Sequence, residues 1–238
     1  AYNQALPSSF NTAKVTNMGE MFGGCSRFDQ ALPNSFNTTA VTDMSYMFYA
    51  CSTYNQALPS SFKTAAVTDM SNMFAGCTAF NQSLASFTLN AGVNLANFLD
   101  NTGLSVANYD ATLTAFNAQN VTGRSMGAAG LKYCASEADR ANLVKTVANG
   151  GKSWTITDGG KLCSPTITVS GPLGAFFPCS GTASAEQSFT VGGSNLTNNI
   201  TITAPTDYEV STTSGSGFGT SINLPQNGGG SVASTTIY

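Results

Sequence analysis

The first hundred residues of this chain repeat with a fixed step of 26 residues. One block of aromatic, polar and leucine residues starts at Tyr2, and its copies start at Phe28, Tyr54 and Phe80. A repeat this short cannot enclose a core of its own, so its copies must stack and share one. This period therefore constrains the possible folds more strongly than any other feature.

A second block keeps the same step and carries the apolar pattern of each copy. Its apolar spacings of three, four and three predict one face of a short helix; in the first copy these positions are Val15, Met18, Phe22 and Cys25. In the second copy, Thr42 or Asp43 is suited to cap such a helix at its N-terminus. The remaining stretch from Phe28 to Phe36 is broken by Pro33 and predicts a short strand or an extended segment.

The fourth copy departs from the pattern. Val93 to Leu99 matches the helical block after one deletion, and no cysteine follows it. A terminal repeat that caps a stack is expected to be atypical. The start of the chain shows no such cap, and Thr236 to Tyr238 reads as the middle of a strand, so we expect a fragment of a longer protein.

Composition narrows the possible functions. Charged residues make up 9% of the chain and the net charge is −3, without a basic stripe, so nucleic-acid binding is not expected. No apolar run reaches the roughly 18 residues of a membrane span. The chain has no histidine, which excludes Ser-His-Asp and Cys-His catalysis. We expect no cofactor and no enzymatic activity.

The repeat motif resembles a known family. Phe-Asn-Gln-x-Leu followed by Val-Thr-Asp-Met-Ser-x-Met-Phe-x-x-Cys is similar to the BspA-like leucine-rich repeat (DUF285 type) of bacterial surface proteins. The resemblance covers residues 1–100, although Phe stands at 10, 36 and 62 where the family often has Trp. Segments within 102–160 resemble the region that closes such arrays in Bacteroidetes proteins, and 179–211 resembles Ig-like modules.

Together these features predict a mixed α+β fold in three parts. A leucine-rich-repeat-type solenoid of 26-residue repeats would occupy residues 1–100, its C-terminal capping region 101–163, and an all-β Ig-like sandwich, truncated at its last strand, 164–238. Helices are expected over 108–118 and 136–148, with Ser136 as N-cap, and a strand over 154–157. Further strands are expected at 166–169, 188–191, 200–203 and 208–211.

The six cysteines are expected to play structural roles. Cys25, Cys51 and Cys77 share one column of the repeat, which favours a buried thiol ladder over a metal site. Cys134 and Cys163 bracket the capping region, and a disulfide between them would close a loop of about 30 residues and stabilise the fold by ~3 kcal/mol. Cys179 has no obvious partner.

Two other columns admit a functional and a structural interpretation. Asp43 and Asp69 lie one repeat apart, as paired catalytic carboxylates would, but the repeat explains them as capping residues. The methionine column is best explained as core packing; its members are Met18, Met21, Met44, Met47, Met70 and Met73.

A polar column leaves its two interpretations open. It is either an internal hydrogen-bond ladder that satisfies backbone groups or a stripe that faces a ligand. Its members are Asn3, Gln4, Asp29, Gln30, Asn55, Gln56, Asn81 and Gln82.

The sequence therefore predicts a secreted or cell-surface, non-catalytic protein. The leading hypothesis is an adhesin that binds other proteins or glycans at the cell surface. The alternative is a structural subunit or stalk of a surface fibre, in which copies of the chain or adjoining domains associate through strand edges and repeat stacking.

Overall fold

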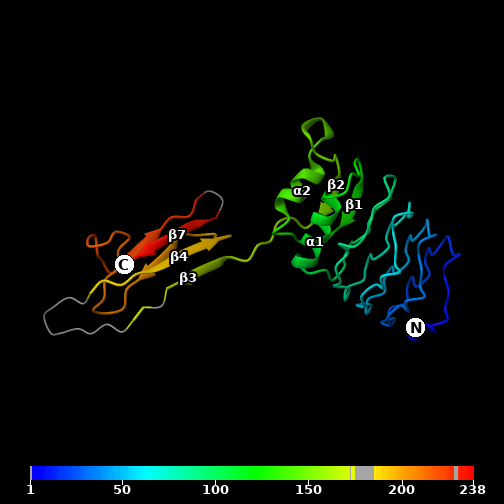
Figure 1. Cartoon of the computed structure of the whole chain (residues 1–238), viewed down its shortest axis with the longest axis horizontal. Helices are drawn as coiled ribbons and strands as arrows, with labels where there is room; N and C mark the ends of the chain where they lie inside the picture. The colour runs from blue at the N-terminus through cyan, green and yellow to red at the C-terminus, as the bar shows by residue number, and fades with distance from the viewer. Residues whose placement is uncertain (1, 172, 175–184, 228–229) are drawn as a thin grey trace. The chain divides into compact units, whose positions relative to one another are not determined.

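The computed structural model describes residues 2–171, 173–174, 185–227 and 230–238. The chain forms two compact units, Ala1–Leu162 and Cys163–Tyr238, and Figure 1 shows the coils, helices and strands of each. Cys179 and the rest of the stretch from 175 to 184 lie outside the described residues.

The repeats are built from consecutive turns that are bonded to the next copy. In the first copy, alternate N–H groups donate to carbonyl groups one repeat later: Glu20 to Ser45, Phe22 to Met47 and Gly24 to Tyr49. The N–H groups between them donate to carbonyl groups three residues earlier and so close turns. The same alternation recurs in the second and third copies. Backbone polar groups are thus satisfied partly within a copy and partly between copies.

The predicted helix in each repeat is wrong. Two positions per copy have a positive φ, which interrupts any α-helix; they are Glu20 and Gly24, Tyr46 and Ala50, Asn72 and Gly76, and Asn97 and Asn101. The three, four, three spacing of apolar residues arises here because successive turns also return side chains to one side. Of the short strand or extended segment predicted from Phe28 to Phe36, the strand does not form, since the described residues before α1 form isolated bridges only.

The predicted fold class, a mixed α+β leucine-rich-repeat-type solenoid with a cap and an Ig-like sandwich, is therefore wrong for this chain. The described residues contain two α-helices, α1 (Val106–Asn117) and α2 (Glu137–Val144), and small sheets of two or three strands. Turns produce the apolar period from which the sequence predicts a helix and a strand. The period alone cannot distinguish such turns from a helix.

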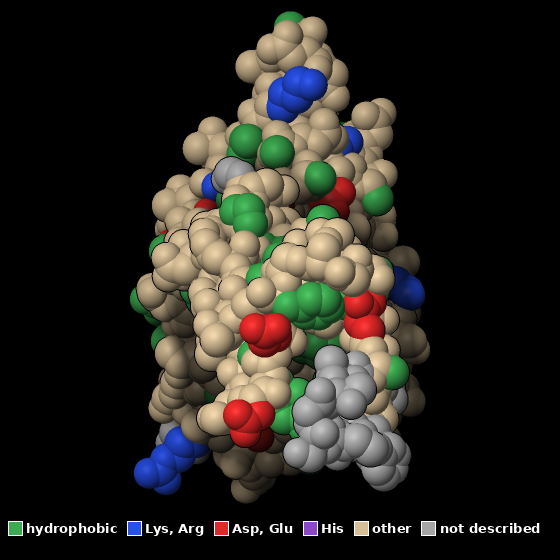
Figure 2. All heavy atoms as spheres, turned by 90° about the vertical axis from the view of Figure 1, so that its left-hand side faces the viewer, with side chains coloured by type: hydrophobic (Ala, Val, Ile, Leu, Met, Phe, Trp, Pro, Cys, Tyr) green, Lys and Arg blue, Asp and Glu red, His purple; other side chains and the backbone are tan. Residues whose placement is uncertain are grey.

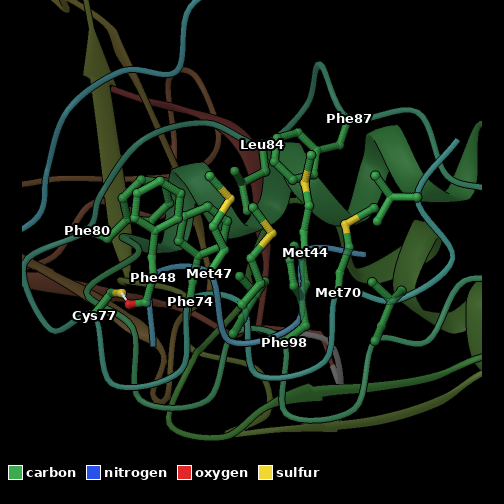
Figure 3. Packing of buried hydrophobic residues seen from close by; sticks show 14 of the residues in the cluster. Met44, Met47, Phe48, Met70, Phe74, Cys77, Phe80, Leu84, Phe87 and Phe98 are labelled. Atoms are coloured by element: carbon green, nitrogen blue, oxygen red, sulfur yellow. Dashed lines mark hydrogen bonds between the residues drawn. The ribbon is translucent and has the colours of Figure 1, made fainter. Parts of the chain in front are cut away.

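Stacked aromatic rings form the core of the repeats. Phe22, Phe48 and Phe74 lie one above the next with ring centroids 5.3 and 5.4 Å apart. Parallel columns run through Phe28, Tyr54 and Phe80 and through Phe36, Phe62 and Phe87. Methionines fill the space beside them, and Met44, Met47 and Met70 are fully buried among the rings (Figure 3). Met21, in the first copy, is 36% exposed.

Residues after the repeats extend the same core. Helix α1 buries Tyr109, Leu113 and Phe116. Strands β1 (Ser125–Ala128) and β2 (Thr155–Asp158) pair in parallel, and a 3-10 helix, η1 (Val147–Asn149), follows α2. These elements lie close to the segments where the sequence predicts helices and a strand.

The second unit is all-β, as the sequence predicts for this part of the chain. A three-stranded antiparallel sheet has the order β3 (Thr166–Ser170), β4 (Phe189–Ser194), β7 (Val232–Ile237). A two-stranded sheet pairs β5 (Ile200–Thr203) with β6 (Ser221–Leu224). The strand predicted at 208–211 is reduced to a single bridge between Val210 and Gly219.

Candidate functional site

The polar column forms a continuous chain of hydrogen bonds across the repeats. The Asn3 Oδ1 atom accepts from the Asp29 backbone N–H and the Gln30 side-chain amide, both at 3.0 Å. Each later rung repeats the arrangement one copy further on: Asp29 accepts from Asn55 and Gln56, and Asn55 accepts from Asn81 and Gln82. Gln4 is exposed in the first copy.

The column ends on the first helix after the repeats. Asn81 Oδ1 accepts from the Ser105 N–H and from the Asn108 side-chain amide, both at 2.8 Å. Ser105 is also the N-cap of α1. The side chains are thus engaged with one another, as an internal ladder requires, and binding of a ligand by the same stripe stays a prediction.

The cysteine column is buried and donates to backbone carbonyl groups. Cys51 Sγ donates to the carbonyl oxygen of Phe22 at 2.9 Å, and Cys77 Sγ to that of Phe48 at 2.8 Å (Figure 3). Burial, with a smaller contribution from the neighbouring thiol, raises the pKa of each to about 12. Cys25 is a free, half-buried thiol. At neutral pH both buried thiols are therefore protonated and hydrogen-bonded to the backbone.

The remaining described cysteines are oxidised. Cys134 and Cys163 are both disulfide-bonded. Their pairing with each other stays a prediction.

The paired carboxylates cap turns. Asp43 Oδ1 accepts from the Ser45 N–H at 2.9 Å and from its hydroxyl at 2.7 Å, while Asp43 Oδ2 accepts from the Asn17 amide at 3.0 Å. Asp69 accepts from the Ser71 N–H at 2.8 Å and from the Asn94 amide. The prediction that Asp43 or Thr42 begins a helix is wrong, because no helix follows. Each carboxylate serves its own turn and ties one copy to a neighbour.

An exposed tyrosine pair was not anticipated from the sequence. Tyr46 and Tyr49 are 38% and 44% exposed, and their rings meet edge to face with centroids 5.4 Å apart. The other copies carry Glu20, Asn72 and Asn97 in place of Tyr46, and Gly23, Ala75 and Asp100 in place of Tyr49. When the repeats are aligned by column, the second copy is the one with tyrosine at these two positions. This difference between the copies is visible in the sequence and marks the pair.

The backbone at Tyr46 is held in an unfavourable conformation. Its φ is +56°, in the left-handed region that bulky residues rarely adopt. Asn72 and Asn97 occupy the same position with φ of +56° and +53°, and asparagine tolerates this region well. A tyrosine here is therefore not the residue that stability alone would select. Strained residues of this kind cluster at functional sites.

Comparison with known proteins shows that the repeats are similar to one protein family. Residues 1–111 match DUF285. The family is described as "Mycoplasma protein of unknown function, DUF285", which confirms the DUF285 part of the resemblance and leaves the Bacteroidetes origin and the Ig-like module unconfirmed. No curated protein and no solved structure matches the chain. We refer to residues 1–111 as the DUF285 region.

The DUF285 region is joined to the elements that follow by a buried carboxylate. Asp110 accepts hydrogen bonds from the N–H groups of Cys134, Ala135 and Ser136 and, at 2.6 Å, from the Ser136 hydroxyl. Burial by itself would raise the pKa of Asp110, but these hydrogen bonds outweigh burial and lower it. Because its hydroxyl serves Asp110, Ser136 precedes α2 without a side-chain capping bond to that helix.

A second buried cluster links α2 to β2. Arg140 forms an ion pair with Asp158 at 2.7 Å and stacks over the Tyr133 ring at 5.0 Å. The Tyr109 hydroxyl donates to Asp158 at 3.1 Å. Burial, reinforced by the Asp158 charge, raises the pKa of Tyr109. Both oxygens of Asp158 are thus engaged, by Arg140 and by the Tyr109 hydroxyl, so we interpret the cluster as structural.

The surface offers little charge for recognition. Figure 2 shows one face on which a few acidic and basic side chains interrupt an otherwise uncharged surface. A groove of about 1050 Å³ in the second unit is lined by residues that include Phe189, Ile202, Phe218 and Glu186. Glu186 accepts from the Ser214 hydroxyl and the Gly215 N–H, both at 2.8 Å. Its carboxylate is thus used within the fold.

No described helix is both long enough and apolar enough to cross a lipid bilayer.

Proposed function

We propose that the chain is an extracellular, non-catalytic surface protein that acts as an adhesin, and that its DUF285 region binds a partner protein through Tyr46 and Tyr49. The exposed tyrosine pair carries this proposal. Two large aromatic side chains stand on a surface with few charges, and one of them is held at an unfavourable φ. Tyrosine is enriched at protein interfaces because it offers much contact area at low conformational cost.

The extracellular location is supported by composition and by cysteine chemistry. Cys134 and Cys163 are disulfide-bonded, and such bonds persist mainly in oxidising compartments outside the cytosol. The non-catalytic role is supported by the use of the carboxylates. Asp43, Asp69 and Asp110 are engaged in turns and backbone hydrogen bonds, and the chain has no histidine.

The test is binding of the full chain to an array of purified extracellular-matrix proteins and glycans. Tyr46→Asn and Tyr49→Ala should each weaken binding to a retained protein by tenfold or more, because a contact residue at an interface centre contributes about 2 kcal/mol or more. Tyr208→Ala is the matched control, since Tyr208 is 44% exposed in the other unit, and it should leave binding unchanged.

Two results would contradict the proposal. One is a chain that retains no ligand from the array. The other is a retained protein whose affinity is the same for the wild type and both tyrosine variants. Retention of glycans alone, lost in both variants, would support the binding role and overturn a protein as its ligand.

The second candidate is a structural subunit of a surface assembly. It is favoured by the edge strand β3, whose five residues are all exposed.

A further inference from the structure

The two sheets of the second unit differ in width. Three strands, β3, β4 and β7, form one layer, and two strands, β5 and β6, form the other. Val191, Val232 and Ile237 of the first layer share one buried cluster with Ile200 and Leu224 of the second. The inner face of the wider sheet therefore packs against a narrower one.

The register of β3 identifies which of its side chains point to that inner face. Val169 pairs directly with Val191, and Ile167 pairs with Gly193. Directly paired residues project from the same face of a sheet. Val191 is 3% exposed, yet Ile167 and Val169 on the same face are 57% and 64% exposed. Among the described residues, the sheet of β5 and β6 therefore does not cover the inner face of β3.

The outer edge of β3 is equally open. The strand pairs with β4 along one edge, and no pairing of its other edge occurs in the described part of the chain. Natural edge strands are commonly protected by charged residues, proline or a bulge. Thr166–Ser170 contains no charge and no proline, and its pairing with β4 is regular over five residues.

We propose that β3 associates with β3 of a second copy of this chain, antiparallel and centred on Thr168. In this register Ile167 lies opposite Val169 of the second copy, and Thr166 lies opposite Ser170. Apolar residues meet apolar residues and hydroxyl groups meet hydroxyl groups on both sides of the two-fold axis. The two sheets become one, and four β-branched apolar side chains gather at the centre of its inner face.

The contact is a weak one by size. Five residue pairs bury less than the roughly 1,200 Å² of a standard stable interface. Association is therefore concentration-dependent, and many copies side by side on a surface would strengthen it. This inference deepens the structural candidate and does not depend on ligand binding at Tyr46 and Tyr49.

A disulfide trap tests the register. The two-fold axis places Thr168 opposite itself, where Cα atoms of directly opposed residues are about 4.5–5.5 Å apart, within the range a disulfide spans. Thr168→Cys should give a cross-linked dimer under mild oxidation. Thr166→Cys is the matched control, because it lies four positions from its own copy, about 13 Å away. Both variants carry Cys25→Ser, so that cross-links cannot form through this half-buried free thiol.

Sedimentation velocity of the full chain over a concentration series provides the second readout. The wild type should shift from monomer toward dimer, and Val169→Lys should raise the dissociation constant at least tenfold. Val147→Lys is the control, since Val147 is 55% exposed in the other unit, and it should have no effect. Because Val169 is exposed, its substitution should not disturb folding.

Three results would overturn the proposal: a monomer at every concentration, a dimer that Val169→Lys leaves intact, or equal cross-linking of the two cysteine variants. The array assay separates this outcome from ligand binding, since the β3 variants should bind ligand as the wild type does.

Discussion

At the scale of single residues, equivalent positions in successive repeats can be compared with one another. One column holds Phe28, Tyr54 and Phe80 at equivalent buried positions. The Tyr54 hydroxyl is buried and has no hydrogen-bond partner among the described residues, and burial raises the pKa of Tyr54. An unsatisfied buried hydroxyl destabilises a fold.

Replacing Tyr54 by phenylalanine should therefore stabilise the protein. We expect Tyr54→Phe to raise the free energy of unfolding by about 1 kcal/mol, because it removes an unpaired polar group and keeps the ring. Denaturant unfolding measures the change. Tyr2→Phe, at an exposed position of the same column, is the control and should change little. A loss of stability in Tyr54→Phe would mean that the hydroxyl has a partner in solution.

At Tyr46, one substitution is expected to raise stability and to weaken binding of the partner protein. Tyr46→Asn places at a positive φ the residue that two other copies use there, and should raise the free energy of unfolding by about 0.5–1 kcal/mol. Tyr49→Asn should not, because Tyr49 has no positive φ. If Tyr46→Asn is less stable than the wild type, ring contacts outweigh the backbone strain.

At the scale of structural elements, the thiol column links pH to stability. Cysteine thiols ionise near pH 9.0 when free, and burial raises the pKa of Cys51 and Cys77 to about 12. Between these values the unfolded chain loses protons that the folded chain keeps. Stability must then fall as pH rises from about 9 to 12, by up to ~1.4 kcal/mol per pH unit for each thiol.

The double variant Cys51→Ala/Cys77→Ala tests this dependence. Its free energy of unfolding should be lower at pH 7, because packing and two hydrogen bonds are lost. Above pH 9 it should decline less steeply than that of the wild type, although tyrosine ionisation continues in both. Equal slopes for the two proteins would show that these thiols ionise normally in the folded state.

The Asp110 carboxylate holds the loop before α2 against α1. Asp110→Ala removes the acceptor of four hydrogen bonds and leaves buried N–H groups unpaired, so it should lower the free energy of unfolding by about 3 kcal/mol. Glu137→Gln is the control, since Glu137 forms an exposed ion pair with Lys161, and it should cost less than about 1 kcal/mol. Similar effects of both substitutions would contradict a special role for Asp110.

At the scale of the whole molecule, the pairing of the oxidised cysteines is open to a direct test. If Cys134 and Cys163 are bonded to each other, Cys134→Ser should release one new thiol that reacts with maleimide, detected by intact mass. The single variant and the double variant Cys134→Ser/Cys163→Ser should then lose the same stability, about 3 kcal/mol. A Cys134→Ser protein without a new reactive thiol would exclude this pairing.

The sequence by itself determined the repeat, its columns and the character of their residues. The 26-residue step fixed that Cys51, Met44 and Phe48 would be buried together, because a period that recurs in space must bury the same face in each copy. It also located α1, α2 and most strands of the second unit, where local patterns and tertiary packing agree.

The conformation within each repeat was decided only by tertiary structure. Val15 to Cys25 has the spacing of a helix, but its N–H groups bond alternately within the copy and to the next copy. The apolar period of the sequence does not reveal hydrogen bonds whose acceptor lies 25 residues away. The uncovered face of β3 could not be predicted for a similar reason, because the exposure of a residue depends on which neighbouring layer covers it.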